Sequence, residues 1–193
     1  MDFIIRENII PFTNINLALF TLCYFEPHSN YINYNNLYSI CYCWNHIIFF
    51  TFNGAYFMDN TCFTRMAIRK RLSLPIFHIG NMILHNLPFL YVNIYIPKNV
   101  TLYHSLLGCL TNLLWCYWST FGTFDIEHVY VYMKKQQQIK LYIINISSIF
   151  YAPLIFYINK NIRNVLHWVG FEPTKLSLCE LESHPLDHSG TNA

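Results

Sequence analysis

The positions of the acidic residues constrain this chain more than any other feature. Five long apolar runs cover most of the first 158 residues, and all ten carboxylate side chains lie outside these runs. The ten are Asp2, Glu7, Glu26, Asp59, Asp125, Glu127, Glu172, Glu180, Glu182 and Asp187. Apolar runs of about 20 residues that exclude acidic side chains are typical of membrane-spanning helices. The pattern predicts an all-α integral membrane bundle of about five transmembrane helices.

The low content of charged residues supports the same prediction. Charged residues make up only 11% of the 193-residue chain, whereas soluble domains contain roughly 25%. Too few charges are present to cover the surface of a soluble domain of this length. The net charge of +2 comes from scattered basic residues, which excludes a nucleic-acid partner. The expected partner is therefore the lipid bilayer.

Each apolar run is long enough to form one membrane-crossing helix, which needs about 17–25 residues. The five expected spans are residues 9–25, 37–57, 72–96, 102–124 and 139–158. We expect the first run to be a span and not a signal peptide, because Asp2 and Glu7 precede it and no small-residue cleavage site follows it. Residues 1–158 therefore form one transmembrane domain, followed by a tail at residues 159–193.

Lysine and arginine residues set the expected orientation. The N-terminal segment and the loops after the second and fourth runs together hold eight of the 12 basic residues. The eight are Arg6, Arg65, Arg69, Lys70, Arg71, Lys134, Lys135 and Lys140. Basic loops remain on the cytosolic side of a membrane. The distribution therefore predicts a cytosolic N-terminus and a C-terminus outside the cell or in a lumen.

The tail differs in composition from the rest of the chain. Glycine, proline, glutamate and serine become common in "WVGFEPTKLSLCELESHPLDHSGT", and the bias toward Ile, Asn and Tyr stops. This segment resembles the translation of a transfer-RNA gene read on the antisense strand, with "VGFEPT" corresponding to the T-arm. The alternative is a genuine soluble tail in which His184, Asp187, His188 and Ser189 form a hydrolase site. We expect a disordered, spuriously translated tail, and we exclude these residues as catalytic candidates.

Cysteine and histidine positions argue against a metal or a disulfide framework. The chain has seven cysteines, five of which lie inside the apolar runs, and this is not a disulfide framework. His78 and His85 are about 10.5 Å apart along a helix axis, which is too far for two rigid imidazoles to share an ion. No acidic residue or cysteine cluster inside the runs completes a ligand set. No metal site and no cofactor is expected.

Three polar side chains recur at helical spacing in the third apolar run. His78, Asn81 and His85 are spaced i, i+3 and i+7, so they share one stripe of a helix. Gly80 is expected to admit a neighbouring helix closely, and Pro88 frees the backbone carbonyl four residues earlier. The stripe therefore faces protein or a wet cavity. Its groups either hydrogen-bond across helices or mark a catalytic or transport site.

Thr51 in the second run is the candidate nucleophile. Thr51 is expected about 6 Å to the cytosolic side of the midpoint of the second span. His78 is expected about 9 Å to the same side of the midpoint of the third span, and His85 lies near the bilayer centre. A hydroxyl and an imidazole at one level can act as a nucleophile and its base. Asn81 or Asn53 would orient the base or stabilise the oxyanion. The structural alternative is that Thr51 bonds to a carbonyl of its own helix.

Two segments resemble a known family. "FTFNGAYFMD", residues 50–59, is similar to the "TFWxxY…D" segment of the androgen-induced family of multi-pass membrane hydrolases, and "LLWCYWSTFGTFDIEHVY", residues 113–130, is similar to its "LWxYxxxGTWVY" region. The resemblance implies hydrolysis of esters of hydroxy fatty acids by an intramembrane threonine, here Thr51, and a histidine. The chain departs from the family at Asn53, where the family has tryptophan. It also has "HIGNMILHNLP" where the family has "NHxMHT" ahead of the proline.

The sequence therefore supports two functional hypotheses for a multi-pass membrane protein. In the first, the protein is an intramembrane lipid-ester hydrolase with Thr51 as nucleophile and His85 or His78 as base. In the second, the protein is not an enzyme and has a structural or small-solute transport role, with the polar stripe packing helices together. Neither hypothesis requires a cofactor.

Overall fold

Helices account for all the regular structure in the part of the chain that the structure describes. The computed structural model describes residues 12–25, 34–97, 100–121 and 135–170; of the predicted tail at residues 159–193, the part beyond Gly170 lies outside these ranges. The described residues form six helices and no strand. The helices are α2 (Phe12–Phe25), α3 (Tyr34–Met58), α4 (Thr61–Arg69), α5 (Leu74–Ile94), α6 (Leu102–Phe121) and α7 (Lys135–Trp168). The prediction of an all-α fold is confirmed.

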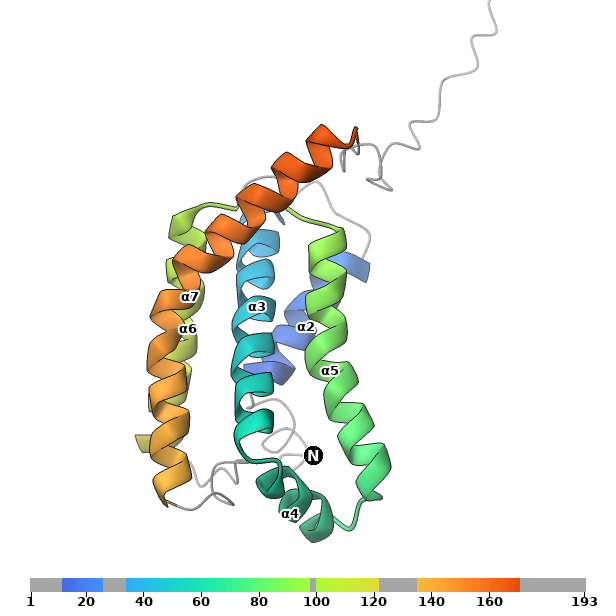
Figure 1. The fold of residues 1–193 in the computed structure, drawn as a ribbon, viewed down its shortest axis with the longest axis vertical. Helices are drawn as coiled ribbons and strands as arrows, with labels where there is room; N and C mark the ends of the chain where they lie inside the picture. Colours follow the sequence, from blue (N-terminus) through green and yellow to red (C-terminus); the bar gives the residue numbers. More distant parts are fainter. Residues whose placement is uncertain (1–11, 26–33, 98–99, 122–134, 171–193) are drawn as a thin grey trace, which may run out of the picture.

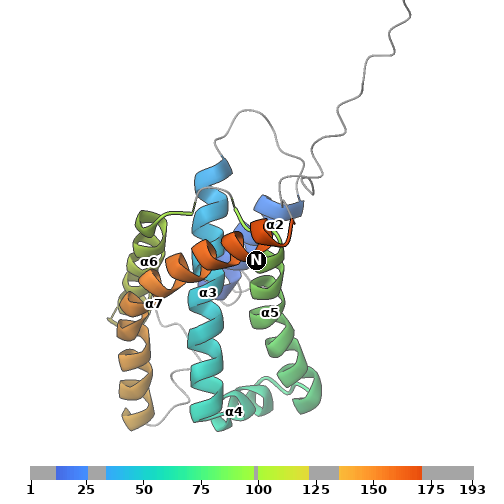
Figure 2. The same cartoon turned by 45° about the horizontal axis from the view of Figure 1, so that its top comes forward.

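Helix α3 is the centre of the bundle and packs against each of the other long helices, α2, α5, α6 and α7. Figure 1 shows α6 and α7 on one side of α3, and α2 and α5 on the other. Helices α3 and α6 run in one direction, and α5 and α7 run in the opposite direction (Figure 1). The short helix α4 lies across the end of the bundle where α3 finishes and α5 begins (Figures 1 and 2).

Each predicted apolar run contains one long helix, but α7 continues past residue 158, the predicted end of the fifth run, to Trp168. The residues of α7 that face the core explain why the helix continues. Ile155 is buried, and Ile162 and Leu166 pack against the same core at helical spacing. The polar residues between them lower the hydropathy of the segment without ending the helix. This last part of α7 tilts across α3 near the end where α3 begins (Figure 1).

Helix α4 occupies residues that the sequence analysis assigned to a loop. Cys62, Phe63 and Ala67 are buried, and the first two pack with residues of α3 and α5 in a second, smaller core. The Asp59 carboxylate holds the start of the helix by accepting hydrogen bonds from the backbone N–H and the hydroxyl of Thr61, at 2.9 and 2.6 Å. A nine-residue amphipathic helix is too short and too polar to appear as an apolar run.

The main core is formed by α2, α3, α5, α6 and α7 around Cys41, Tyr42 and Ile47, which are fully buried. In the described part of the chain, no helix has both the length and the apolar composition that crossing a membrane requires. The helical class is thus confirmed, and the membrane-spanning part of the prediction stays a prediction.

Among the glycines that the structure describes, the closest approach of another helix occurs at Gly108 of α6 and not at Gly80 of α5, which corrects the sequence-based expectation. A Cβ atom built on Gly108 would lie 3.0 Å from the Cβ of Cys43 and 3.4 Å from the indole of Trp44, both on α3. A Cβ atom on Gly80 would have no neighbour within 4 Å among the described residues. Gly108 therefore lets α3 and α6 pack closely, whereas Gly80 faces open space.

The two glycines provide a matched pair of substitutions. Gly108→Leu should lower the free energy of unfolding by about 1–3 kcal/mol, because the added side chain forces α3 and α6 apart. Gly80→Leu should leave stability unchanged or raise it by up to about 1 kcal/mol, since leucine is the better helix former. The thermal midpoints of both variants in detergent measure the difference. Equal midpoints would contradict the close contact at Gly108.

Candidate functional site

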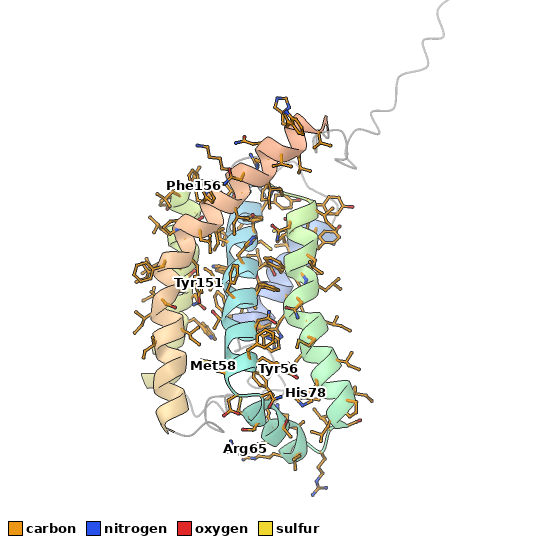
Figure 3. The ribbon with its side chains drawn as sticks, viewed as in Figure 1. Tyr56, Met58, Arg65, His78, Tyr151 and Phe156 are labelled. Atoms are coloured by element: carbon orange, nitrogen blue, oxygen red, sulfur yellow. The ribbon has the colours of Figure 1, made fainter. Side chains whose placement is uncertain are left out.

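His78 joins three helices at the end of the bundle closed by α4. Its Nδ1 atom lies 2.9 Å from the hydroxyl of Tyr56 on α3, and its Nε2 atom lies 3.3 Å from the hydroxyl of Thr64 on α4. Figure 3 shows Tyr56 and His78 beside each other near α4. Because the Thr64 hydroxyl donates to the carbonyl of Asn60, Nε2–H of His78 donates to Thr64 and Nδ1 accepts from Tyr56. Both ring nitrogens are therefore used in holding helices together.

His85 has a different environment, in which one ring nitrogen faces a hydroxyl group. Its Nδ1 atom lies 2.8 Å from the carbonyl oxygen of Asn81, so Nδ1 carries the proton and donates it. Its Nε2 atom lies 3.4 Å from the hydroxyl of Thr13 on α2 and can accept a proton from it. The ring also stacks on Phe52, with centroids 3.8 Å apart and an interplanar angle of 11°. Half-buried His85 is therefore held in one orientation with its basic nitrogen toward Thr13.

The two predicted supporting amides differ in what they contact. The Asn81 side chain donates to the carbonyl of Phe77 on its own helix, at 3.0 Å. The Asn53 side chain donates both to its own helix, at Phe49, and across to the Asn86 side-chain oxygen of α5, each at 2.8 Å. The α5 partner of Asn53 is thus Asn86, which the sequence analysis did not select. Asn86 lies on the face of α5 next to the predicted stripe.

Thr51, the predicted nucleophile, lies on α3 with its hydroxyl oxygen buried. That oxygen has no hydrogen-bond partner among the described residues, so it is hydrogen-bonded neither to His78 or His85 nor to a carbonyl of its own helix. The structure instead pairs His85 with Thr13. The i, i+3 spacing of Thr13 and Asn16 in the first apolar run is the sequence signal that predicts a polar face there.

Further polar pairs connect α3 to its neighbours. Asn16 of α2 donates to Asn45 at 2.8 Å, and the Trp44 indole donates to the hydroxyl of Thr111 on α6, also at 2.8 Å. Asn45 is also bonded to its own helix at the carbonyl of Cys41. Side-chain hydrogen bonds therefore run from α3 to α2, α5 and α6.

The described residues include no cluster of metal ligands, and the thiol of α4 is not activated. Across residues 12–25, 34–97, 100–121 and 135–170, no three metal-ligating side chains lie together. Burial and the nearby Asp59 carboxylate raise the pKa of the Cys62 thiol on α4 to about 11. Cys62 therefore remains protonated at neutral pH and is not a reactive nucleophile.

Comparison of the chain with protein-family models, with curated proteins and with solved structures gives no match. The resemblance to the androgen-induced family therefore stays a prediction. The site is defined by its geometry alone, in which Thr13, His85 and Asn81 form one connected set and Asn53 and Asn86 form another.

The Asn53–Asn86 pair can be measured by a double-mutant cycle. Replacing each residue by leucine, singly and together, should give a coupling free energy of about 0.6 kcal/mol, which is the average for hydrogen bonds between helices in a membrane protein. The matched cycle of Asn53 with Asn81 should give a coupling near zero, because Asn81 bonds to its own helix. Unfolding in detergent monitored by circular dichroism supplies the four stabilities of each cycle. A larger coupling for Asn53 with Asn81 would contradict this arrangement.

Proposed function

We propose that the chain is a multi-pass integral membrane protein whose long helices cross the bilayer. One observation carries the proposal: the outward face of α5 is apolar along its whole length. Six aliphatic residues at helical spacing are each between 52% and 73% exposed, namely Ile76, Ile79, Ile83, Leu87, Leu90 and Ile94. They span about 27 Å at 1.5 Å per residue, close to the roughly 30 Å of a bilayer core. A soluble helix would place polar residues on this face.

The neighbouring helices support the same proposal. Large apolar side chains are exposed on α6 at Leu106, Leu110 and Leu114, and on α7 at Ile146 and Phe150. Large exposed apolar side chains therefore recur on the outward sides of three helices, whereas monomeric soluble proteins rarely expose large apolar patches. Lipid is the environment in which such a surface is stable.

Polar residues are found on the inside of the same bundle. Asn45, His46, Asn112 and Ser148 are among the buried polar residues. These side chains lower the mean hydropathy of their helices, although the outward faces remain apolar. In a membrane, polar groups that face the bundle interior avoid contact with hydrocarbon.

The basic residues favour one orientation of this bundle. Arg65, Arg69, Lys70 and Arg71 all lie on α4 or just after it, at the end where α3 finishes. The positive-inside rule assigns this end to the cytosol. With helices crossing alternately, the N-terminus is cytosolic and the C-terminus lies outside the cell or in a lumen.

Membrane integration is tested by alkaline carbonate extraction. The protein should remain in the membrane pellet. Ile79→Lys together with Leu87→Lys should prevent stable integration, because a lysine inside a span costs up to roughly 3 kcal/mol, the value at the centre. In a soluble protein the same exposed positions would tolerate lysine. Release of the wild-type chain by carbonate, with a folded and soluble double variant, would overturn the proposal.

A second function, lipid-ester hydrolysis, is favoured by the Thr13–His85–Asn81 arrangement. A nucleophilic hydroxyl, a base and a group that orients the base are the parts required for covalent ester hydrolysis. His85 Nε2 would take the Thr13 proton as its oxygen attacks the ester carbonyl, and would then give that proton to the leaving alkoxide. Water would hydrolyse the acyl-threonine, with His85 accepting its proton and returning it to Thr13. The 3.4 Å distance is of the loose kind that tightens when substrate binds.

The family resemblance assigns Thr51 as nucleophile, whereas the geometry supports Thr13. Thr13→Val and Thr51→Val are matched variants, because each removes one hydroxyl and keeps the shape of the side chain. A fluorophosphonate probe on the full-length protein in detergent should label the wild type and Thr51→Val but not Thr13→Val. Loss of labelling in Thr51→Val alone would favour the assignment from the resemblance. No labelling of a folded wild type would leave the non-enzymatic role, in which these polar groups hold the helices together.

A further inference from the structure

Helix α4 is a rigid basic element at one end of the bundle. One face is fixed by the buried residues Cys62, Phe63 and Ala67. Its first turn is held by Asp59, and the guanidinium of Arg65 donates to the hydroxyl of Thr61 at 3.0 Å. Figures 1 and 2 show α4 lying across the bundle end, so that its other face is directed away from the core.

Four basic residues are concentrated on α4 and the turn after it. Arg65, Arg69, Lys70 and Arg71 are exposed, and Asp59 is the only acidic residue between positions 57 and 76. Arg71 adopts a left-handed backbone conformation with φ 53°. This conformation ends the helix, with the N–H of Leu72 bonded to the carbonyl of Ala67 at 2.9 Å, and it places three consecutive cations in one turn.

Exposed apolar residues lie before, between and after these cations along the chain. Phe57 is 83% exposed and Ile68 is 62% exposed, and Met58, Leu72 and Ile76 are also exposed. A nucleic acid or an acidic peptide would pair with the cations and leave these side chains in water. An interface between lipid headgroups and acyl chains accommodates both kinds of residue. Long basic side chains extend toward the headgroups while their apolar neighbours enter the acyl region.

We propose that α4 and residues 70–72 form a binding site for the headgroup of an anionic phospholipid in the cytosolic leaflet. The site rests on the proposed membrane integration of the bundle. Lys70 and Arg71 are placed to bind the lipid phosphate, and Arg65 adds to the local positive charge. Ile68 and Leu72 anchor the element in the acyl region of the same leaflet.

Arg71→Gly is the most informative variant. Glycine is the residue that most readily adopts a positive φ, so this change removes a cation without disturbing the end of α4. Its matched control is Lys160→Gln, which removes one exposed cation from α7 at the opposite end of the bundle.

The experiment uses the full-length protein in nanodiscs of phosphatidylglycerol and phosphatidylcholine, with retained lipids identified by native mass spectrometry. Wild type and Lys160→Gln should retain phosphatidylglycerol in preference to phosphatidylcholine. Arg71→Gly should bind phosphatidylglycerol about fivefold more weakly, and Lys70→Gln with Arg71→Gly about 25-fold more weakly, as expected near an anionic surface. Inorganic phosphate at 10-fold excess over the lipid should not compete, since it lacks the acyl chains.

Equal retention by wild type, Arg71→Gly and the double variant would overturn the site while leaving membrane integration intact. Equal weakening by Lys160→Gln would also overturn it, because binding would then follow net charge and not α4. Failure of the wild type to enter nanodiscs would instead overturn the proposed membrane integration, and the lipid site with it.

Discussion

Hydrogen bonding of polar side chains to partners inside the bundle is the constraint on which this fold depends. The central helix α3 carries polar groups on several faces. These groups form hydrogen bonds with Asn16, Asn86 and Thr111 of the neighbouring helices. A buried polar group without a partner destabilises a folded protein by more than a formed bond stabilises it. The relative rotation of the helices around α3 is therefore set by these pairs as much as by apolar packing.

The helical class and the positions of the long helices could be read from the sequence, because nearly continuous apolar runs of about 20 residues are a strong signal. Helix ends were less predictable. The helix α7 persists to Trp168 because Ile162 and Leu166 pack against the core, and such contacts are not visible in mean hydropathy. Helix α4 was not predicted from the sequence for a related reason, since its buried face consists of only three residues.

The candidate site was predictable in part. The sequence indicated that His78 and His85 face protein, and both contact neighbouring helices. It did not indicate which hydroxyl would lie beside His85, because depth along a helix axis does not fix the rotation of the partner helix. That rotation brings Thr13 to His85 and leaves Thr51 elsewhere. For the same reason Gly108, and not Gly80, marks the close helix contact.

The short connection through α4 has a consequence for the order in which such a chain is assembled. Helices α3 and α5 are joined by α4, and they are bonded to each other by Asn53 with Asn86 and by Tyr56 with His78. These four polar side chains therefore have partners within the hairpin, before α6 and α7 have been synthesised. In a cell this hairpin can form as one unit while the chain is still being synthesised, with these side chains already paired, and later helices can add to it.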